Sequence, residues 1–132
     1  MKKGVLRNEE GFTLIEIIAV LVILGILAAV AVPKYVNMMT QAKTSATLGE
    51  VAEIKGTLNA GWGKALLVNG GSTVTPAQAM SNAGLAASGT LGTAPDNWAY
   101  TATANATGVA VSVLSRGGDT AYNGTGVWNM PQ

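Results

Sequence analysis

Hydrophobic residues form one long run near the N-terminus, and Glu16 is the only charged residue inside it. The run extends from Phe12 to Val32. As a helix with a rise of about 1.5 Å per residue, it would span roughly 30 Å, the thickness of a bilayer core. Residues 1–11, "MKKGVLRNEEG", precede it, and their lysines and arginine favour a cytoplasmic N-terminus. The pattern therefore predicts a transmembrane helix rather than the short apolar core of an ordinary signal peptide.

A helical pattern resumes after Pro33, so we predict one helix over residues 12–67. Proline lacks the backbone donor and clashes with the preceding turn, which predicts a kink at Pro33. Apolar positions then recur mostly three or four residues apart, at Val36, Met39, Ala46, Val51, Ile54, Leu58, Trp62 and Ala65. Polar residues occupy the other side, at Asn37, Gln41, Lys43, Thr47, Glu50, Lys55 and Lys64. Four glycines allow another backbone to approach closely, Gly49, Gly56, Gly61 and Gly63. The helix is expected to end at "NGG", residues 69–71.

The C-terminal half has the pattern of a small mixed domain. "TPAQAMSNAG", residues 75–84, has an N-cap threonine, a proline at the first helical position and a closing glycine. Alternation of apolar and small polar residues predicts strands, with turn-forming residues between them. The expected strands are 97–104, 108–115 and 120–130, with turns at 105–108 and 115–119. The predicted fold class is α+β, with a long N-terminal helix packed on a small antiparallel sheet.

Composition argues against an enzyme. The chain has no histidine and no cysteine, so the commonest general base, the thiolate nucleophile and the usual zinc ligands are missing. The net charge of +1 provides no basic surface for nucleic acid. Asp96 and Asp119 are candidates for a shared calcium site, but two loop carboxylates are more often solvated turns. We expect no catalytic residues, no cofactor and no metal.

Glu16 needs an explanation, because an ionisable group in hydrocarbon costs about 2.5–3.5 kcal/mol on insertion scales. One explanation places Glu16 near the membrane surface, where its side chain reaches water. The other gives it a cationic partner in a packed assembly. The nearest candidate is the α-amino group that cleavage just before Phe12 would create, either in the same chain or in a neighbouring subunit.

The segment "GFTLIE", from Gly11 to Glu16, together with the apolar helix and Pro33, resembles the class III signal of type IV pilins and their relatives. The resemblance is strong over residues 1–55. It implies that a prepilin peptidase cuts between Gly11 and Phe12 and N-methylates Phe12. It also implies that Glu16 pairs with the amine of Phe12 in an adjacent subunit during filament growth.

The resemblance implies three regions: a leader, 1–11; a transmembrane and assembly helix, 12–33; and a globular pilin domain, 34–132. The subunit would polymerise with itself into a surface filament for adhesion, motility or DNA uptake. Its other partners would be the prepilin peptidase, the assembly machinery of the inner membrane, and membrane lipid before assembly. The precursor would reside in the bacterial inner membrane and the mature subunit in an extracellular pilus.

Within this group, the phrase "AVPKYVNMMTQAK" at 31–43 and the cysteine-free tail resemble type IVa and mannose-sensitive-haemagglutinin-like pilins. A pseudopilin of type II secretion is the alternative function. Such proteins carry a Pro-Trp-Gly-type motif late in the chain, of which "APDNWAY" at 94–100 is a loose echo. A membrane-tethered periplasmic binding module is the second alternative.

Overall fold

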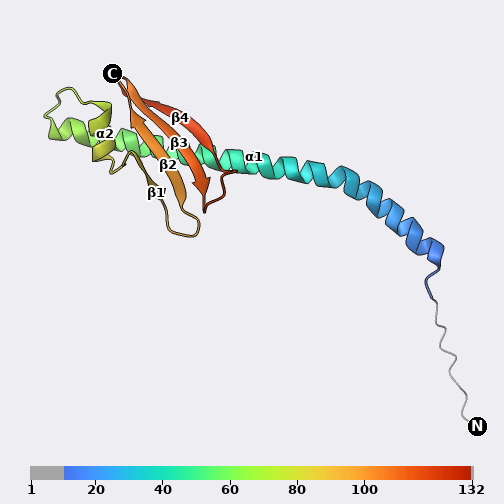
Figure 1. Cartoon of the computed structure of the whole chain (residues 1–132). Helices are drawn as coiled ribbons and strands as arrows, with labels where there is room; N and C mark the ends of the chain where they lie inside the picture. The colour runs from blue at the N-terminus through green and yellow to red at the C-terminus, as the bar shows by residue number, and fades with distance from the viewer. Residues whose placement is uncertain (1–10, 132) are drawn as a thin grey trace, which may run out of the picture. The chain divides into compact units, whose positions relative to one another are not determined.

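Two helices and four strands make up the described chain, in a computed structural model that covers residues 11–131. The predicted leader therefore lies outside the described residues, apart from Gly11. The elements are α1 (Leu14–Val68), α2 (Pro76–Asn82), β1 (Ser88–Leu91), β2 (Trp98–Ala104), β3 (Gly108–Arg116) and β4 (Gly124–Asn129). The α+β class, with a long N-terminal helix and a small antiparallel sheet, is confirmed (Figure 1). Packing divides the chain into two compact units, with the boundary between Met38 and Met39.

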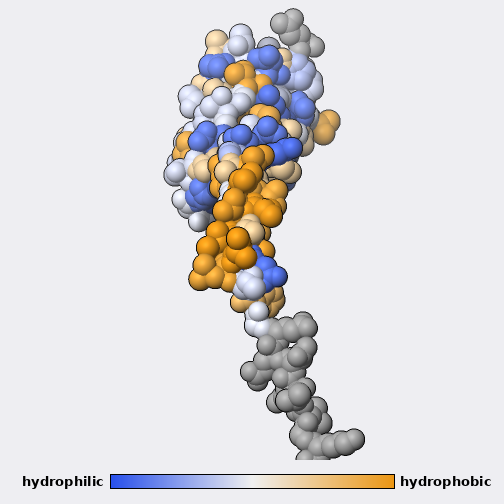
Figure 2. All heavy atoms as spheres, turned by 90° about the vertical axis from the view of Figure 1, so that its right-hand side faces the viewer, coloured by the Kyte–Doolittle hydropathy of each residue, from blue (hydrophilic) through white to orange (hydrophobic). Residues whose placement is uncertain are grey.

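In the first unit, α1 leaves its apolar side chains uncovered. Leu14, Ile15, Leu21, Ile26, Leu27 and Val30 are among those at least 60% exposed. These side chains gather into one apolar surface (Figure 2). The most apolar window of α1 has a mean hydropathy of 3.0 and no buried residue, so by length and composition α1 is able to cross a membrane.

Pro33 lies inside α1, and the helix is assigned without interruption on both sides of it. The ring leaves no N–H at this position for the carbonyl one turn earlier. The kink expected from the sequence stays a prediction.

In the second unit, α1 buries a narrow stripe of side chains against the sheet: Thr47, Val51, Ile54, Leu58, Gly61 and Ala65. Four positions of the predicted apolar stripe are among these buried residues: Val51, Ile54, Leu58 and Ala65. The predicted stripe is wrong at Met39, which is 46% exposed. It also placed Thr47 on the polar side, whereas Thr47 is buried. Its hydroxyl donates to the carbonyl of Lys43 at 2.9 Å, so burial leaves no unsatisfied polar group.

The sheet is an antiparallel meander in the order β1-β2-β3-β4, and its inner face lies along the second half of α1 (Figure 1). Three of its strands were predicted, with ends within a few residues of those observed. β1, a four-residue edge strand of sequence SGTL, was not predicted. The buried side chains of the inner face are Tyr100, Ala102, Val109, Val111, Val113 and Trp128. They pack on Ile54 and Leu58 to form the core.

Trp128 joins the sheet to α1 by a directed contact as well as by packing. Its ring is 4% exposed, and its Nε1 donates to the Asn59 side-chain oxygen at 2.7 Å. A buried indole N–H without a partner would be costly, so Asn59 fixes the position of β4 along the helix.

The two predicted turns are confirmed, each with the local chemistry that its residues allow. At 105–108 the Asn105 side-chain oxygen accepts from the backbone N–H of Thr107 and Gly108, at 3.1 and 2.8 Å. At 115–119 two glycines have positive φ angles, 55° at Gly117 and 84° at Gly118. These angles favour glycine and let β3 reverse toward β4.

Helix α2 begins as predicted and approaches α1 closely at Gly61. Thr75 is its N-cap and exchanges hydrogen bonds with Gln78 in a capping box. A Cβ added at Gly61 would overlap the carbonyl oxygen of Ala79 and lie 2.6 Å from Ala83. Gly49, Gly56 and Gly63 have nothing within 4 Å of an added Cβ. Close approach of another backbone, expected at all four helix glycines, therefore occurs at Gly61 alone within the described chain.

The C-terminal end of α1 is capped by backbone hydrogen bonds at the predicted "NGG". Gly70 N–H donates to the Leu67 carbonyl at 3.3 Å, and Gly71 N–H donates to the Leu66 carbonyl at 2.8 Å. Gly70 has a φ of 62°. This pair of bonds around a left-handed glycine is a Schellman motif.

Candidate functional site

The start of α1 is held by a reciprocal contact between Thr13 and Glu16. The carboxylate oxygen Oε2 of Glu16 accepts from the Thr13 backbone N–H at 2.8 Å and from its hydroxyl at 2.7 Å. In return, the Glu16 N–H donates to the Thr13 hydroxyl oxygen at 3.4 Å. The two residues form a capping box, which satisfies donors that the first helical turn would otherwise leave free.

This contact gives Glu16 a role that the sequence analysis missed. Thr-x-x-Glu directly before an apolar run is the sequence signal for a capping box. A carboxylate at the first turn also interacts favourably with the positive end of the helix dipole. Its second oxygen, Oε1, makes no hydrogen bond within residues 11–131. Within the described residues, the capping box therefore leaves Oε1 of Glu16 able to accept from another group.

Gly11 and Phe12 precede the capping box and are open to an external partner. Nothing in the described chain lies within 4 Å of a Cβ built on Gly11, and Phe12 is 85% exposed. The helix begins at Leu14, so the bond between Gly11 and Phe12 lies before it, outside any helix or strand. The predicted cleavage bond is accessible within the first unit, together with the residue that cleavage would place at the new terminus.

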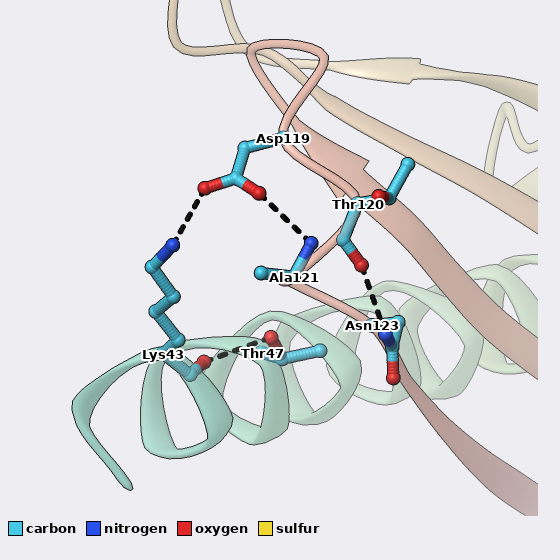
Figure 3. Close-up of polar contacts among 6 residues, drawn as sticks. All are labelled: Lys43, Thr47, Asp119, Thr120, Ala121 and Asn123. Atoms are coloured by element: carbon cyan, nitrogen blue, oxygen red, sulfur yellow. Dashed lines mark hydrogen bonds and ion pairs between the residues drawn. The ribbon is translucent and has the colours of Figure 1, made fainter. Parts of the chain in front are cut away.

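A second polar cluster ties the β3–β4 connection to α1 within the second unit (Figure 3). Lys43 Nζ donates to Asp119 Oδ2 at 2.7 Å, and the other oxygen of Asp119 accepts from the Ala121 N–H at 2.9 Å. The bond from Lys43, then that from Ala121, lowers the pKa of Asp119. The same contact with Asp119 raises the pKa of Lys43.

Aromatic rings and cations extend this cluster toward the start of β2. Lys43 Nζ lies 5.0 Å from the centroid of the Tyr122 ring. Arg116 lies over Trp98 and Tyr122, 5.3 and 5.7 Å from their centroids, and the two rings meet edge to face. The Arg116 Nε is 3.9 Å from the nearer oxygen of Asp96 and has no hydrogen-bond partner in the described chain. These contacts hold the β3–β4 connection against the second half of α1.

The two calcium candidates lie beside different cations. Asp119 is bonded to Lys43, and Asp96 faces Arg116. Among residues 11–131, no three acidic, histidine or cysteine side chains are arranged to hold a metal ion. Both oxygens of Asp119 are already hydrogen-bonded, so this carboxylate is positioned to fix a loop.

We expect Asp119 to make the second unit less stable in acid. Its pKa is lowered in the folded chain, so its contribution is present above the unfolded value of about 3.9 and is lost as the pH falls through the folded value. In Asp119→Asn, the urea concentration at the unfolding midpoint should therefore decrease less steeply below about pH 4 than in the wild type. Asp96→Asn is the matched control for removal of a loop carboxylate, because Asp96 has only the longer ion pair, 3.9 Å from Arg116. Equal slopes in the wild type and Asp119→Asn would contradict the prediction.

Glu50 has the opposite dependence. Burial first, and then the neighbouring Glu53, raise its pKa, while Arg116 lowers it. A raised carboxyl pKa means that stability is lost as the pH rises through the folded value, so Glu50 does not account for loss of stability in acid.

The N-terminal segment matches a known family of proteins. Residues 6–32 match the family described as the prokaryotic N-terminal methylation motif. The chain carries a prepilin-type N-terminus. The matched range includes Gly11, Phe12 and Glu16 and the exposed apolar part of α1, so the motif coincides with the capping box and the uncovered helix.

Over part of its length the chain is similar to filament and secretion proteins. The type II secretion system core protein G of Pseudomonas aeruginosa is 47% identical over 53 residues, which are 40% of this chain and 37% of that protein. Fimbrial protein Q of Moraxella bovis is 40% identical over 55 residues, 42% of this chain and 35% of that protein. The type IV major fimbrial protein FimA of Dichelobacter nodosus is 40% identical over 47 residues, which are 36% of this chain and 30% of that protein. These similarities support a type IV pilin precursor.

The similarity covers only part of each protein. The matched segments span between 30% and 37% of the relatives' own lengths. No solved structure matches the chain. The family match at residues 6–32 lies before the sheet.

Proposed function

We propose that the chain is the precursor of a type IV pilus subunit, which polymerises through its N-terminal helix into a surface filament for adhesion, motility or DNA uptake. The observation that supports this most directly is the prepilin-type motif on a helix whose apolar side chains are uncovered. An apolar surface of this extent is stable only in lipid or against other apolar surfaces. Lipid before assembly and other subunits afterwards would cover it. The role is structural and not catalytic.

In this proposal a prepilin peptidase cuts between Gly11 and Phe12 and methylates the new amine of Phe12. Residues 12–33 act as the membrane and assembly helix, and residues 34–132 as the globular domain. The free oxygen of Glu16 accepts from the Phe12 amine of a neighbouring subunit, while Thr13 occupies the other oxygen. The precursor resides in the inner membrane, where the assembly machinery takes it up, and the product is an extracellular pilus.

The function is tested by electron microscopy of sheared surface fibres and mass spectrometry of their subunit. We expect fibres whose subunit begins with N-methylated Phe12. A subunit that begins at Met1, or fibres that lack this chain, would contradict the proposal.

A type II secretion pseudopilin is the second candidate, because the similarity to a type II secretion core protein extends over 53 residues, nearly as many as the 55 matched in fimbrial protein Q. Deletion of the gene distinguishes the two. Loss of surface fibres with normal protein secretion supports the pilin, whereas loss of secretion with normal fibres supports the pseudopilin.

The proposed domain boundary predicts that residues 34–132 fold without the membrane helix. They retain the buried stripe of α1 and the whole sheet, so the core is complete. We expect a soluble monomer with mixed helical and β circular dichroism and a cooperative urea transition. A random-coil spectrum would show that the domain needs its neighbours.

A further inference from the structure

The residue that caps the C-terminal end of α1 is an asparagine followed by two glycines. The chain contains two Asn-Gly pairs, Asn69–Gly70 and Asn123–Gly124. Asn69 follows the last helical residue, and its own N–H donates to the Ala65 carbonyl at 2.9 Å. Its side-chain amide makes no hydrogen bond within residues 11–131.

Asparagine is thermolabile, and a following glycine removes the side chain that would obstruct its reaction. The backbone nitrogen of the glycine attacks Cγ of the asparagine. A new N–Cγ bond forms, the bond from Cγ to Nδ2 breaks, and the amide leaves as ammonia with the glycine's amide proton. Water then opens the cyclic imide at either carbonyl and leaves an aspartate or an isoaspartate. Water is the only co-reactant.

We infer that Asn69 is a site of spontaneous conversion to aspartate and isoaspartate. The attacking nitrogen is Gly70 N, whose N–H is held by the longer of the two cap bonds, at 3.3 Å. Nothing lies within 4 Å of a Cβ built on Gly70 or Gly71, so the turn has room to change its conformation. Among residues 11–131, the leaving amide has no partner that must first be released.

Asn123–Gly124 has the same two residues in a different setting. The Asn123 Nδ2 donates to the Thr120 carbonyl at 2.9 Å (Figure 3). Gly124 is the first residue of β4 and pairs with Val113. The leaving amide is therefore restrained by a hydrogen bond, and the attacking nitrogen belongs to a residue of the sheet. If one such hydrogen bond must break before the reaction, conversion should be about fivefold slower.

Conversion of Asn69 changes the end of α1 in two ways. An aspartate or isoaspartate adds a negative charge at the negative end of the helix dipole, where the last turn has no basic residue. An isoaspartate also lengthens the backbone within the Schellman motif. Leu66 and Gly71, which share the shorter cap bond, line an apolar groove of about 320 Å³ together with Trp62 and Met130. The wall of this groove is the part of the domain that conversion would loosen.

The test follows both pairs in the same sample. The full chain in detergent is incubated at mildly alkaline pH in water enriched in the heavy oxygen isotope, and then digested with trypsin. Cleavage after Lys64 and Arg116 places Asn69 and Asn123 in different peptides, 65–116 and 117–132. The heavy oxygen marks conversion that occurs during the incubation, and fragmentation locates it in each peptide.

We expect Asn69 to convert at least about fivefold faster than Asn123, with both aspartate and isoaspartate among the products. Asn69→Gln should abolish the rapid conversion, because the longer side chain closes a larger ring more slowly. No conversion at Asn69, equal or faster conversion at Asn123, or unchanged heavy-oxygen uptake by peptide 65–116 in Asn69→Gln would each overturn the inference.

Discussion

Cells that express Glu16→Ala are expected to insert and process the subunit but to form few or no fibres. Removal of a carboxylate from an apolar segment should ease insertion rather than hinder it. In the assembled fibre the methylated amine of Phe12 would have lost its partner. Removing one side of a buried ion pair costs roughly 3–5 kcal/mol. Fibre counts, with immunoblots of the processed subunit, measure the effect.

Two neighbouring variants separate charge from capping. Glu16→Gln loses the charge but keeps a residue suited to the capping box, whereas Thr13→Ala loses the cap and keeps the charge. If Glu16 pairs with an amine, Glu16→Gln should lack fibres and Thr13→Ala should form them. The reverse result would mean that Glu16 acts only as a cap. Normal fibres in Glu16→Ala would favour a side chain that simply reaches the membrane surface.

Gly61→Ala is expected to destabilise the second unit even though alanine favours helix. Its Cβ would overlap the backbone of α2 at Ala79 and lie 2.6 Å from Ala83, so α2 would have to move. Overpacking of this kind costs about 1–3 kcal/mol, more than the roughly 1 kcal/mol gained in helix propensity. Urea denaturation of residues 34–132, followed by circular dichroism, would measure the loss.

Gly56→Ala is the matched control. The same substitution is made in the same helix, five residues away, where nothing lies within 4 Å of the new Cβ. We expect it to stabilise the unit by about 0.5–1 kcal/mol. Equal effects of the two variants would show that α2 does not rest on Gly61.

The alternating strands and the long helix were predictable because their periodicity is local. β1 was not, because glycine has low strand propensity and the segment SGTL has only four residues, which pair with β2. Thr47 was placed on the wrong face, because no pattern shows that its hydroxyl bonds to its own helix. Among the four helix glycines, only the docking of α2 distinguishes Gly61 from the others.

At the start of α1, the sequence motif indicated candidate residues but not their geometry. Gly11, Phe12 and Glu16 were identified from the motif, and the comparisons match the segment that contains them. The capping box has a sequence signal, Thr-x-x-Glu, but both explanations of Glu16 from the sequence concerned its charge and neither concerned the start of the helix. The cluster of Lys43, Asp119 and Arg116 joins residues far apart in the chain, and no spacing rule connects them.

The placement of the tryptophans gives the protein a natural optical probe. Trp62, Trp98 and Trp128 all lie in the second unit, and the segment from Phe12 to Met38 has none. Because Trp128 is 4% exposed and the other two are half-buried, their emission should lie at shorter wavelength than that of the unfolded chain. Fluorescence therefore follows the domain alone in detergent, in lipid or in a fibre, without a label. Quenchers attached to lipid tails would then show how closely the domain approaches the bilayer.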